Sequence, residues 1–199
     1  LIRERYSIPN LYSLAIPRAP INACTPMPGF TTVLEETFLV GLHLSLHPVA
    51  QNLLIHLGIA PGQLAPNGWR LLMGAIYFWP QHFGYELSLS EFLWTYRPFP
   101  LTNEAGFFGL SARPGKKIIV KYPSNNKGWK NKFFHVSTMG FCEGEPRSGE
   151  GMPTDWALEL RGMARVPFPL LKASFILPFS DLTYSFFSFC LCRWASHST

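Results

Sequence analysis

The fold is decided by a run in the middle of the chain, which reads Asn67-Gly68-Trp69-Arg70-Leu71-Leu72-Met73-Gly74-Ala75-Ile76-Tyr77-Phe78-Trp79-Pro80. The run is so apolar that it must be largely buried, and it predicts the central helix of a packed domain. Asn67 is a favourable N-cap residue, and Pro80 is expected to end the helix because proline lacks a backbone donor. The predicted core consists of large apolar side chains, namely Trp69, Leu72, Ile76, Phe92 and Trp94.

Three further helices are predicted on either side of this run. Apolar residues recur at three- and four-residue spacing over residues 32–44 and indicate a helix there. Pro48 suits the first turn of a helix that reaches Leu57, and Gly58 is the expected residue after its end. Residues 88–91 have the spacing of a capping box ahead of a short apolar run, which predicts a fourth helix.

The pattern then changes to short strands. Runs at 107–111 and 116–121 are β-type and are joined by the turn signal Arg113-Pro114-Gly115, and residues 132–137 are a third candidate strand. The first thirty residues contain five prolines, which favours an extended segment over a helix. The sequence therefore predicts an α+β fold, with a helical N-terminal half followed by a small antiparallel sheet.

Composition sets the class of protein and its division into segments. Of 199 residues, 47% are hydrophobic and only 15% are charged, which excludes a highly charged disordered chain. We expect a proline-rich segment over 1–30, one folded core over 31–139, a linker over 140–165, and an apolar tail over 166–199.

The apolar tail allows two interpretations. Residues 175–192 carry one charge, Asp181, and approach the length of a membrane span. Pro178 and Asp181 interrupt the run, so a poorly ordered or partly buried tail is favoured over a transmembrane helix, which remains the alternative. The four cysteines are scattered, which favours an intracellular setting, in the nucleus or the cytoplasm.

Positive charge is concentrated in one window. Residues 105–142 contain seven basic and no acidic residues, whereas the remaining chain has 10 basic and 12 acidic residues. Aromatic residues interleave with these lysines, a mixture typical of single-stranded nucleic-acid surfaces. The candidate nucleic-acid-binding residues are Lys116, Lys117, Lys121, Lys127, Trp129, Lys130 and Lys132. The alternative is a β-hairpin whose aromatics fill the core and whose lysines face solvent.

Within this window, the loop over residues 125–130 is the strongest single candidate. Asn125 and Asn126 favour a turn, and Gly128 permits an unusual backbone angle. Trp129 has an alternative role here, because it could fill the core while the asparagines hold the turn.

The sequence predicts no catalytic residue, no metal site and no cofactor. Transposition chemistry uses clustered carboxylates to hold two metal ions, but the only aspartates are Asp155 and Asp181. His43 and His47 have the spacing of a zinc pair, yet Pro48 and the lack of a third ligand favour capping or packing roles. The C-terminal Cys-x-Cys pair at 190–192 lacks the spacing of a zinc site.

Five sequence blocks in this order resemble one plant family, the putative gypsy-type transposase domain. They are Arg3-Glu4-Arg5-Tyr6-Ser7-Ile8-Pro9, Ala23-Cys24-Thr25-Pro26, Gly41-Leu42-His43-Leu44-Ser45-Leu46-His47-Pro48, Ala60-Pro61-Gly62-Gln63-Leu64-Ala65-Pro66-Asn67-Gly68-Trp69-Arg70 and Pro123-Ser124-Asn125-Asn126-Lys127-Gly128-Trp129-Lys130. The resemblance covers about residues 1–136 and departs from the family pattern after Val166. It implies a retrotransposon-derived protein, and the family supplies no catalytic residues to carry over.

Two functions follow as expectations. The first is a non-enzymatic domain of a retrotransposon-derived protein that binds RNA or DNA through the lysine and aromatic residues. The second is a protein–protein interaction module without nucleic-acid binding, whose partners are other retroelement proteins. Because phosphate contacts weaken steeply with salt, salt dependence separates the two. A membrane is not an expected partner.

Overall fold

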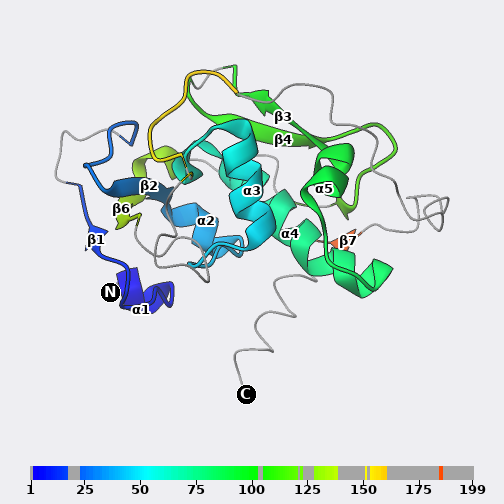
Figure 1. Ribbon diagram of the computed structural model, residues 1–199, viewed down its shortest axis with the longest axis horizontal. Coiled ribbons are helices and arrows are strands. Elements are labelled where there is room, and N and C mark those ends of the chain that lie inside the picture. Colours follow the sequence, from blue (N-terminus) through cyan, green and yellow to red (C-terminus); the bar gives the residue numbers. More distant parts are fainter. Residues whose placement is uncertain are drawn as a thin grey trace.

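The computed structural model describes residues 2–17, 23–102, 105–120, 122, 128–138, 151, 153–160 and 184–185. These residues form the predicted α+β fold, in which helices pack with small sheets (Figure 1). The helices are α1 (Ile2–Arg5), α2 (Glu35–Leu39), α3 (Pro48–Leu57), α4 (Pro66–Phe83) and α5 (Leu89–Thr95), with 3-10 turns η1 (Pro61–Gln63) and η2 (Trp129–Asn131). The strands are β1 (Leu14–Ala15), β2 (Phe30–Leu34), β3 (Tyr96–Pro100), β4 (Phe108–Ala112), β5 (Ile119–Val120), β6 (Phe133–Ser137) and β7 (Tyr184–Ser185).

One sheet joins the N-terminal part of the chain to the end of the basic window. Its order is β1-β6-β2, both pairs are antiparallel, and Thr32 lies opposite His135. This sheet corrects the prediction of a helix over residues 32–44, because only Glu35–Leu39 is helical and the residues before it form β2. Residues 31–34 are all buried, so the polar–apolar alternation that marks a half-buried strand is missing.

The central helix α4 exists as predicted, but its ends differ. It begins at Pro66, whose fixed backbone angle suits the first helical position, so Asn67 lies inside the first turn and is not the N-cap. Pro80 lies within the helix, which continues to Phe83. The ring of Phe83 packs on Trp79 at 4.5 Å between centroids, and this contact holds the extra turn.

Both ends of α3 and the start of α5 are confirmed. α3 starts at Pro48 and is followed by Gly58, whose φ of 67° lies in the left-handed region. Before α5, the Ser88 hydroxyl accepts a hydrogen bond from the Glu91 amide, and the Glu91 carboxylate accepts one from the Ser88 amide at 2.9 Å. This is the predicted capping box.

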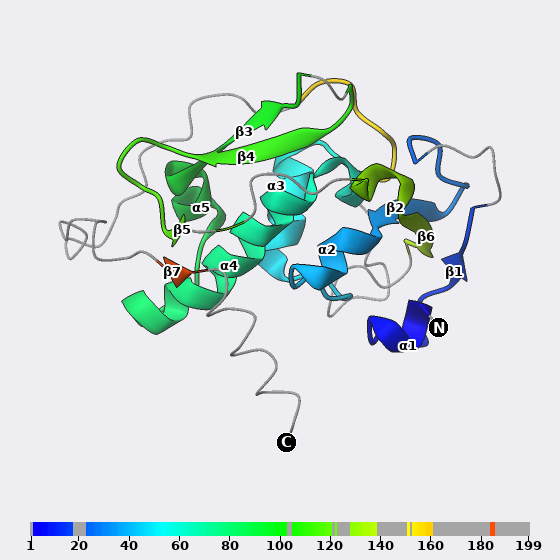
Figure 2. The same cartoon turned by 180° about the vertical axis from the view of Figure 1, so that it is seen from behind.

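Strands β3 and β4 form a two-stranded antiparallel hairpin along α4 (Figure 2). The predicted strand at 107–111 is confirmed as β4, and so is the turn after it, in which the Lys116 amide donates to the Arg113 carbonyl at 3.0 Å. The expected pairing of β4 with residues 116–121 is wrong, because β4 pairs with β3. Two prolines in β3 concealed this strand, since proline is rare in strands.

The hydrophobic core surrounds α4. Trp69, Leu72 and Phe92 are fully buried in one cluster, as predicted. Ile76 is half-buried and packs against the same cluster. Trp94 is the exception, because it lies outside the cluster, half-buried, with the Lys116 ammonium over its ring.

The buried Gln63 side chain ties together three segments of the chain. Its Oε1 atom accepts hydrogen bonds from the amides of Ala60 at 3.0 Å and Ala157 at 2.9 Å. Its Nε2 atom donates to the carbonyls of Gly106 at 2.8 Å and Ala157 at 2.6 Å. The amide group therefore uses both donors and both acceptor positions, as a buried amide must.

Within the expected linker over residues 140–165, the described residues 153–160 include side chains that pack on the domain. Trp156 meets the ring of Phe107 edge-on at 5.0 Å between centroids. The expected tail over 166–199 lies outside the described residues except for Tyr184–Ser185, which pair in parallel with β5. The boundaries between the expected segments stay predictions.

The proline-rich N-terminal segment is held against the core by side chains of the first sequence block. It includes the short helix α1, which the sequence analysis missed. The Arg3 guanidinium donates to three backbone carbonyls at 2.5–3.2 Å, those of Ile8, Pro9 and Tyr12. The Tyr6 hydroxyl donates to Glu35 at 2.5 Å, and burial together with this carboxylate raises the pKa of Tyr6. This block therefore has a structural role.

Candidate functional site

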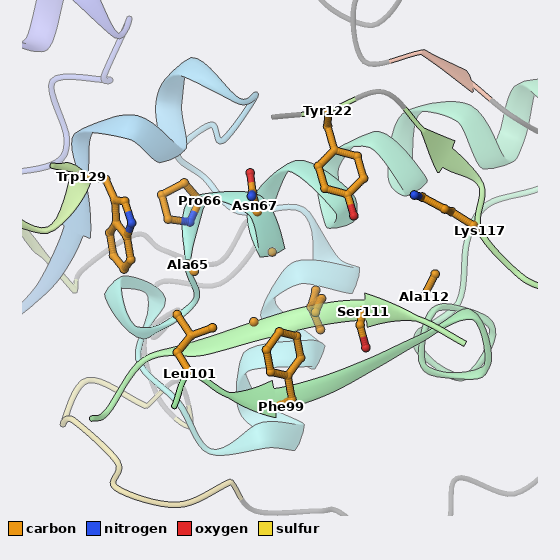
Figure 3. Close-up of a pocket in the computed structure, with 13 residues that line it drawn as sticks. Ala65, Pro66, Asn67, Phe99, Leu101, Ser111, Ala112, Lys117, Tyr122 and Trp129 are labelled. Carbon is orange, nitrogen blue, oxygen red and sulfur yellow. The ribbon is translucent and has the colours of Figure 1, made fainter. Parts of the chain in front are cut away.

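A groove runs between the first turn of α4 and the β3–β4 hairpin (Figure 3). Its volume is about 660 Å³. Three aromatic side chains and three polar ones line it, namely Phe99, Tyr122, Trp129, Asn67, Ser111 and Lys117. No carboxylate is among its lining residues, so its one formal charge is positive.

The α4 wall of the groove is fixed by the sequence block over residues 60–70. The Ala65 amide donates to the Phe108 carbonyl at 2.9 Å, which anchors the start of the helix beside β4. The fully buried Trp69 donates from its indole nitrogen to the Pro61 carbonyl at 3.2 Å. The helix N-terminus carries a partial positive charge, which adds to the positive character of this wall.

The hairpin wall depends on a glycine opposite an aromatic residue. Phe99 of β3 pairs with Gly109 of β4, and a Cβ atom at Gly109 would lie only 2.7 Å from the Phe99 ring. The glycine therefore allows the ring to lie across β4, where it lines the groove and is 36% exposed. On the same strand pair, Arg97 donates to the Ser111 hydroxyl at 3.1 Å.

Opposite the hairpin, Tyr122 and Lys117 point into the groove (Figure 3). The Lys117 ammonium lies 5.5 Å from the centroid of the Tyr122 ring, within the range of a cation–π contact. Lys117 is exposed and Tyr122 is half-buried. This wall therefore offers a positive charge beside an aromatic ring.

Lys116, the neighbour of Lys117, is used inside the fold. Its ammonium lies 3.2 Å from the centroid of the Trp94 ring and donates to the Trp94 carbonyl at 3.3 Å. Burial, with a smaller effect of the Arg113 charge, lowers the pKa of Lys116. A partly buried, packed lysine is a poor phosphate ligand.

At the other end of the basic window, Trp129 lines the groove, but the neighbouring lysines do not. Trp129 is 8% exposed and meets Phe107 edge-on at 4.9 Å, so it closes one end of the groove as a core residue. Lys130 lies over the Trp129 ring at 5.8 Å. The Lys132 ammonium lies 3.9 Å from the Glu36 carboxylate. Neither Lys130 nor Lys132 lines the groove.

Of the seven candidate residues, the structure therefore places Lys117 and Trp129 in one groove. Lys121 and Lys127 lie outside the described residues, and so do residues 125–127, the first half of the candidate loop over residues 125–130. In that loop, Gly128 has the left-handed backbone that its residue type suggests, with φ of 74°. The sequence analysis missed Phe99, and the available signal was its apolar side chain between Pro98 and Pro100.

One member of the histidine pair is used as a helix cap. His47 caps α3, because its Nδ1 atom accepts a hydrogen bond from the Val49 amide at 3.2 Å. In the part of the chain that the structure describes, no group of three potential metal-ligating side chains occurs. The Cys-x-Cys pair at 190–192 lies outside that part.

Comparison with known proteins gives one family match, in the first half of the chain. Residues 32–99 match the sequence model of the family described as putative gypsy type transposon. This match confirms the resemblance over the stretch from β2 to β3, a narrower range than the sequence blocks predicted. Searches of curated proteins and of solved structures gave no match.

The matched range contains the scaffold and only part of the groove. It includes the α4 wall and Phe99, whereas β4, Lys117, Tyr122 and Trp129 follow it in the chain. Among the described residues, no helix combines the length and apolar character needed to cross a membrane. Plant origin stays a prediction.

Proposed function

We propose that this chain is a non-enzymatic domain of a retrotransposon-derived protein and that it binds single-stranded nucleic acid in the groove between α4 and the β3–β4 hairpin. One observation carries the proposal. The groove combines aromatic side chains with Lys117 and has no carboxylate among its lining residues.

This combination suits a flexible polyanion that carries flat bases. Lysine attracts phosphate, and aromatic side chains provide stacking surfaces that tolerate any base. The basic window adds long-range attraction, because residues 105–142 contain no acidic residue. We propose an intracellular location, in the nucleus or the cytoplasm, where such a ligand is available.

The non-enzymatic character rests on the carboxylates of the chain. Polynucleotide transfer with two metal ions needs a cluster of carboxylates around the reacting phosphate. The chain has only two aspartates, 26 residues apart at Asp155 and Asp181, and no glutamate follows Asp181. Binding is therefore a better match to these residues than transfer chemistry.

The test is a salt titration of the full chain with fluorescent single-stranded RNA and DNA. The variant Lys117→Gln removes the charge in the groove, and Lys132→Gln removes one charge from the same basic window outside the groove. We expect Lys117→Gln to weaken binding and to reduce the slope of log affinity against log salt by about 0.7, the value for one single-strand phosphate contact. Lys132→Gln should change both quantities much less.

Two results contradict the proposal. Equal effects of the two substitutions would place the nucleic acid outside the groove. No binding at low salt would reject nucleic acid as the ligand, and the groove would then be assigned to a protein partner.

A further inference from the structure

The outer edge of β4 borders the groove. Thr95 accepts a hydrogen bond from Arg113, and Leu101 donates one to Phe107, both at 2.9 Å. Since backbone groups alternate in direction along an antiparallel strand, the odd-numbered residues of β4 face β3 and the even-numbered ones face outward. The outward groups therefore belong to Phe108, Leu110 and Ala112.

Only the first of these three residues has a strand partner on the outer side within the described ranges. The Phe108 carbonyl accepts from the Ala65 amide, and Leu64 forms an isolated parallel bridge with Phe108. The chain then enters α4, whose first turn forms the other wall of the groove (Figure 3). Leu110 and Ala112 continue along the edge, and both line the groove.

The opposite edge of the hairpin, formed by β3, contains prolines that prevent strand pairing. The same alternation points Pro98 and Pro100 of β3 outward, and proline has no backbone N–H to donate. Prolines on an edge strand prevent pairing with another chain. The hairpin therefore blocks one edge and leaves the other facing the groove.

An aromatic surface lies next to this edge of β4. The Phe99 ring lies across Gly109, and Tyr122 points into the groove from the other wall (Figure 3). The groove thus offers a flat apolar face, backbone donors and acceptors, and the Lys117 charge within one volume of about 660 Å³.

We infer that the groove takes one unstacked base of a single strand, with the base ring on Phe99, its polar edge hydrogen-bonded by the backbone of Leu110 and Ala112, and its phosphate near Lys117. This inference rests on the proposed function and specifies its ligand. Unpaired bases present their hydrogen-bonding edges, whereas in a duplex the Watson–Crick edges are already paired. The site therefore selects single strands over duplexes.

The experiment measures the affinity of the full chain for a short single-stranded oligonucleotide, for its duplex and for an abasic strand of the same length and charge. Phe99→Leu removes the stacking ring. Tyr77→Leu is the matched control, because Tyr77 is 37% exposed, similar to Phe99 at 36%, and lies on α4 outside the groove. Gly109→Ala displaces the Phe99 ring without removing it.

We expect Phe99→Leu to weaken binding of the normal strand roughly 5- to 150-fold, the range for loss of one base–aromatic stack. Gly109→Ala should weaken it in the same direction, Tyr77→Leu should leave it unchanged, and the abasic strand and the duplex should bind weakly to the unmodified protein.

The failures of the two proposals differ. Equal, salt-dependent binding of normal and abasic strands, with no effect of Phe99→Leu, would overturn the base pocket and leave phosphate binding intact. No salt-dependent binding to any strand would overturn the proposed function and this inference with it.

Discussion

Gln63 should be a sensitive polar position in the fold, because its side chain is fully buried and hydrogen-bonded. The substitution Gln63→Leu keeps a side chain of similar size but removes four hydrogen bonds that join Ala60, Gly106 and Ala157. Each such bond contributes about 1 kcal/mol net, and a buried group left unpaired costs more. Ala60 is 1% exposed, so its amide would stay unpaired, whereas the half-buried Gly106 and Ala157 regain water. We therefore expect the free energy of unfolding to fall by about 2–4 kcal/mol.

The assay is urea unfolding of the full chain, with hydrogen exchange at the Ala157 amide as a local readout. Gln81→Leu is the matched control, because Gln81 is exposed and makes one hydrogen bond, to the Tyr77 carbonyl at 2.9 Å. That control should stay within about 0.5 kcal/mol of the unmodified protein. If Gln63→Leu behaves like Gln81→Leu and leaves exchange at Ala157 unchanged, the role assigned to Gln63 is refuted.

Three further predictions concern stability. Gly62→Ala should lower the free energy of unfolding by about 1–3 kcal/mol in urea, because the new Cβ atom would lie 2.7 Å from the Thr32 carbonyl oxygen. Gly74→Ala should lower it less, because its Cβ atom would meet the flexible end of the Ile119 side chain. Ser88→Ala should cost about 1 kcal/mol through loss of the capping box, and an unchanged midpoint would argue against that cap. Burial lowers the pKa of His135, so the unfolded state binds its proton first as pH falls. The contribution of His135 to stability is therefore fully present above pH about 6.5 and decreases as pH falls below it. His135→Gln should flatten that part of the pH profile.

Local signals in the sequence predicted those helices whose ends are set by neighbouring residues. Pro48, Gly58 and the capping box at Ser88 act within one turn, so both ends of α3 and the start of α5 were predicted correctly. The predicted start of α4 was wrong because two helix-start signals are adjacent in the sequence. The helix starts with Pro66 at its first position, and Asn67 is not the N-cap.

Strand pairing was poorly predicted because it depends on distant partners. β2 pairs with β6 about one hundred residues later, and its burial on both sides hides the strand period. β3 contains two prolines that are tolerated only because they face its free edge. Neither fact can be read from the residues of the strand alone.

The groove contains some residues that local sequence signals predicted and others whose positions depend on distant partners. Local charge and aromatic content singled out Lys117 and Trp129, which the structure places in it. The same criterion included Lys116 and Lys132, whose partners Trp94 and Glu36 come from other segments. Phe99 was missed because its position depends on Gly109, on the opposite strand.

The most direct test of the central claim is to map the bound strand on the protein by backbone amide chemical shifts in solution. On titration with a short single-stranded oligonucleotide, we expect the largest changes at Asn67, Leu110 and Ala112, around the groove. Val33 and Val136 in the β1-β6-β2 sheet should change little. Changes centred on that sheet, or none at saturating oligonucleotide, would contradict binding in the groove.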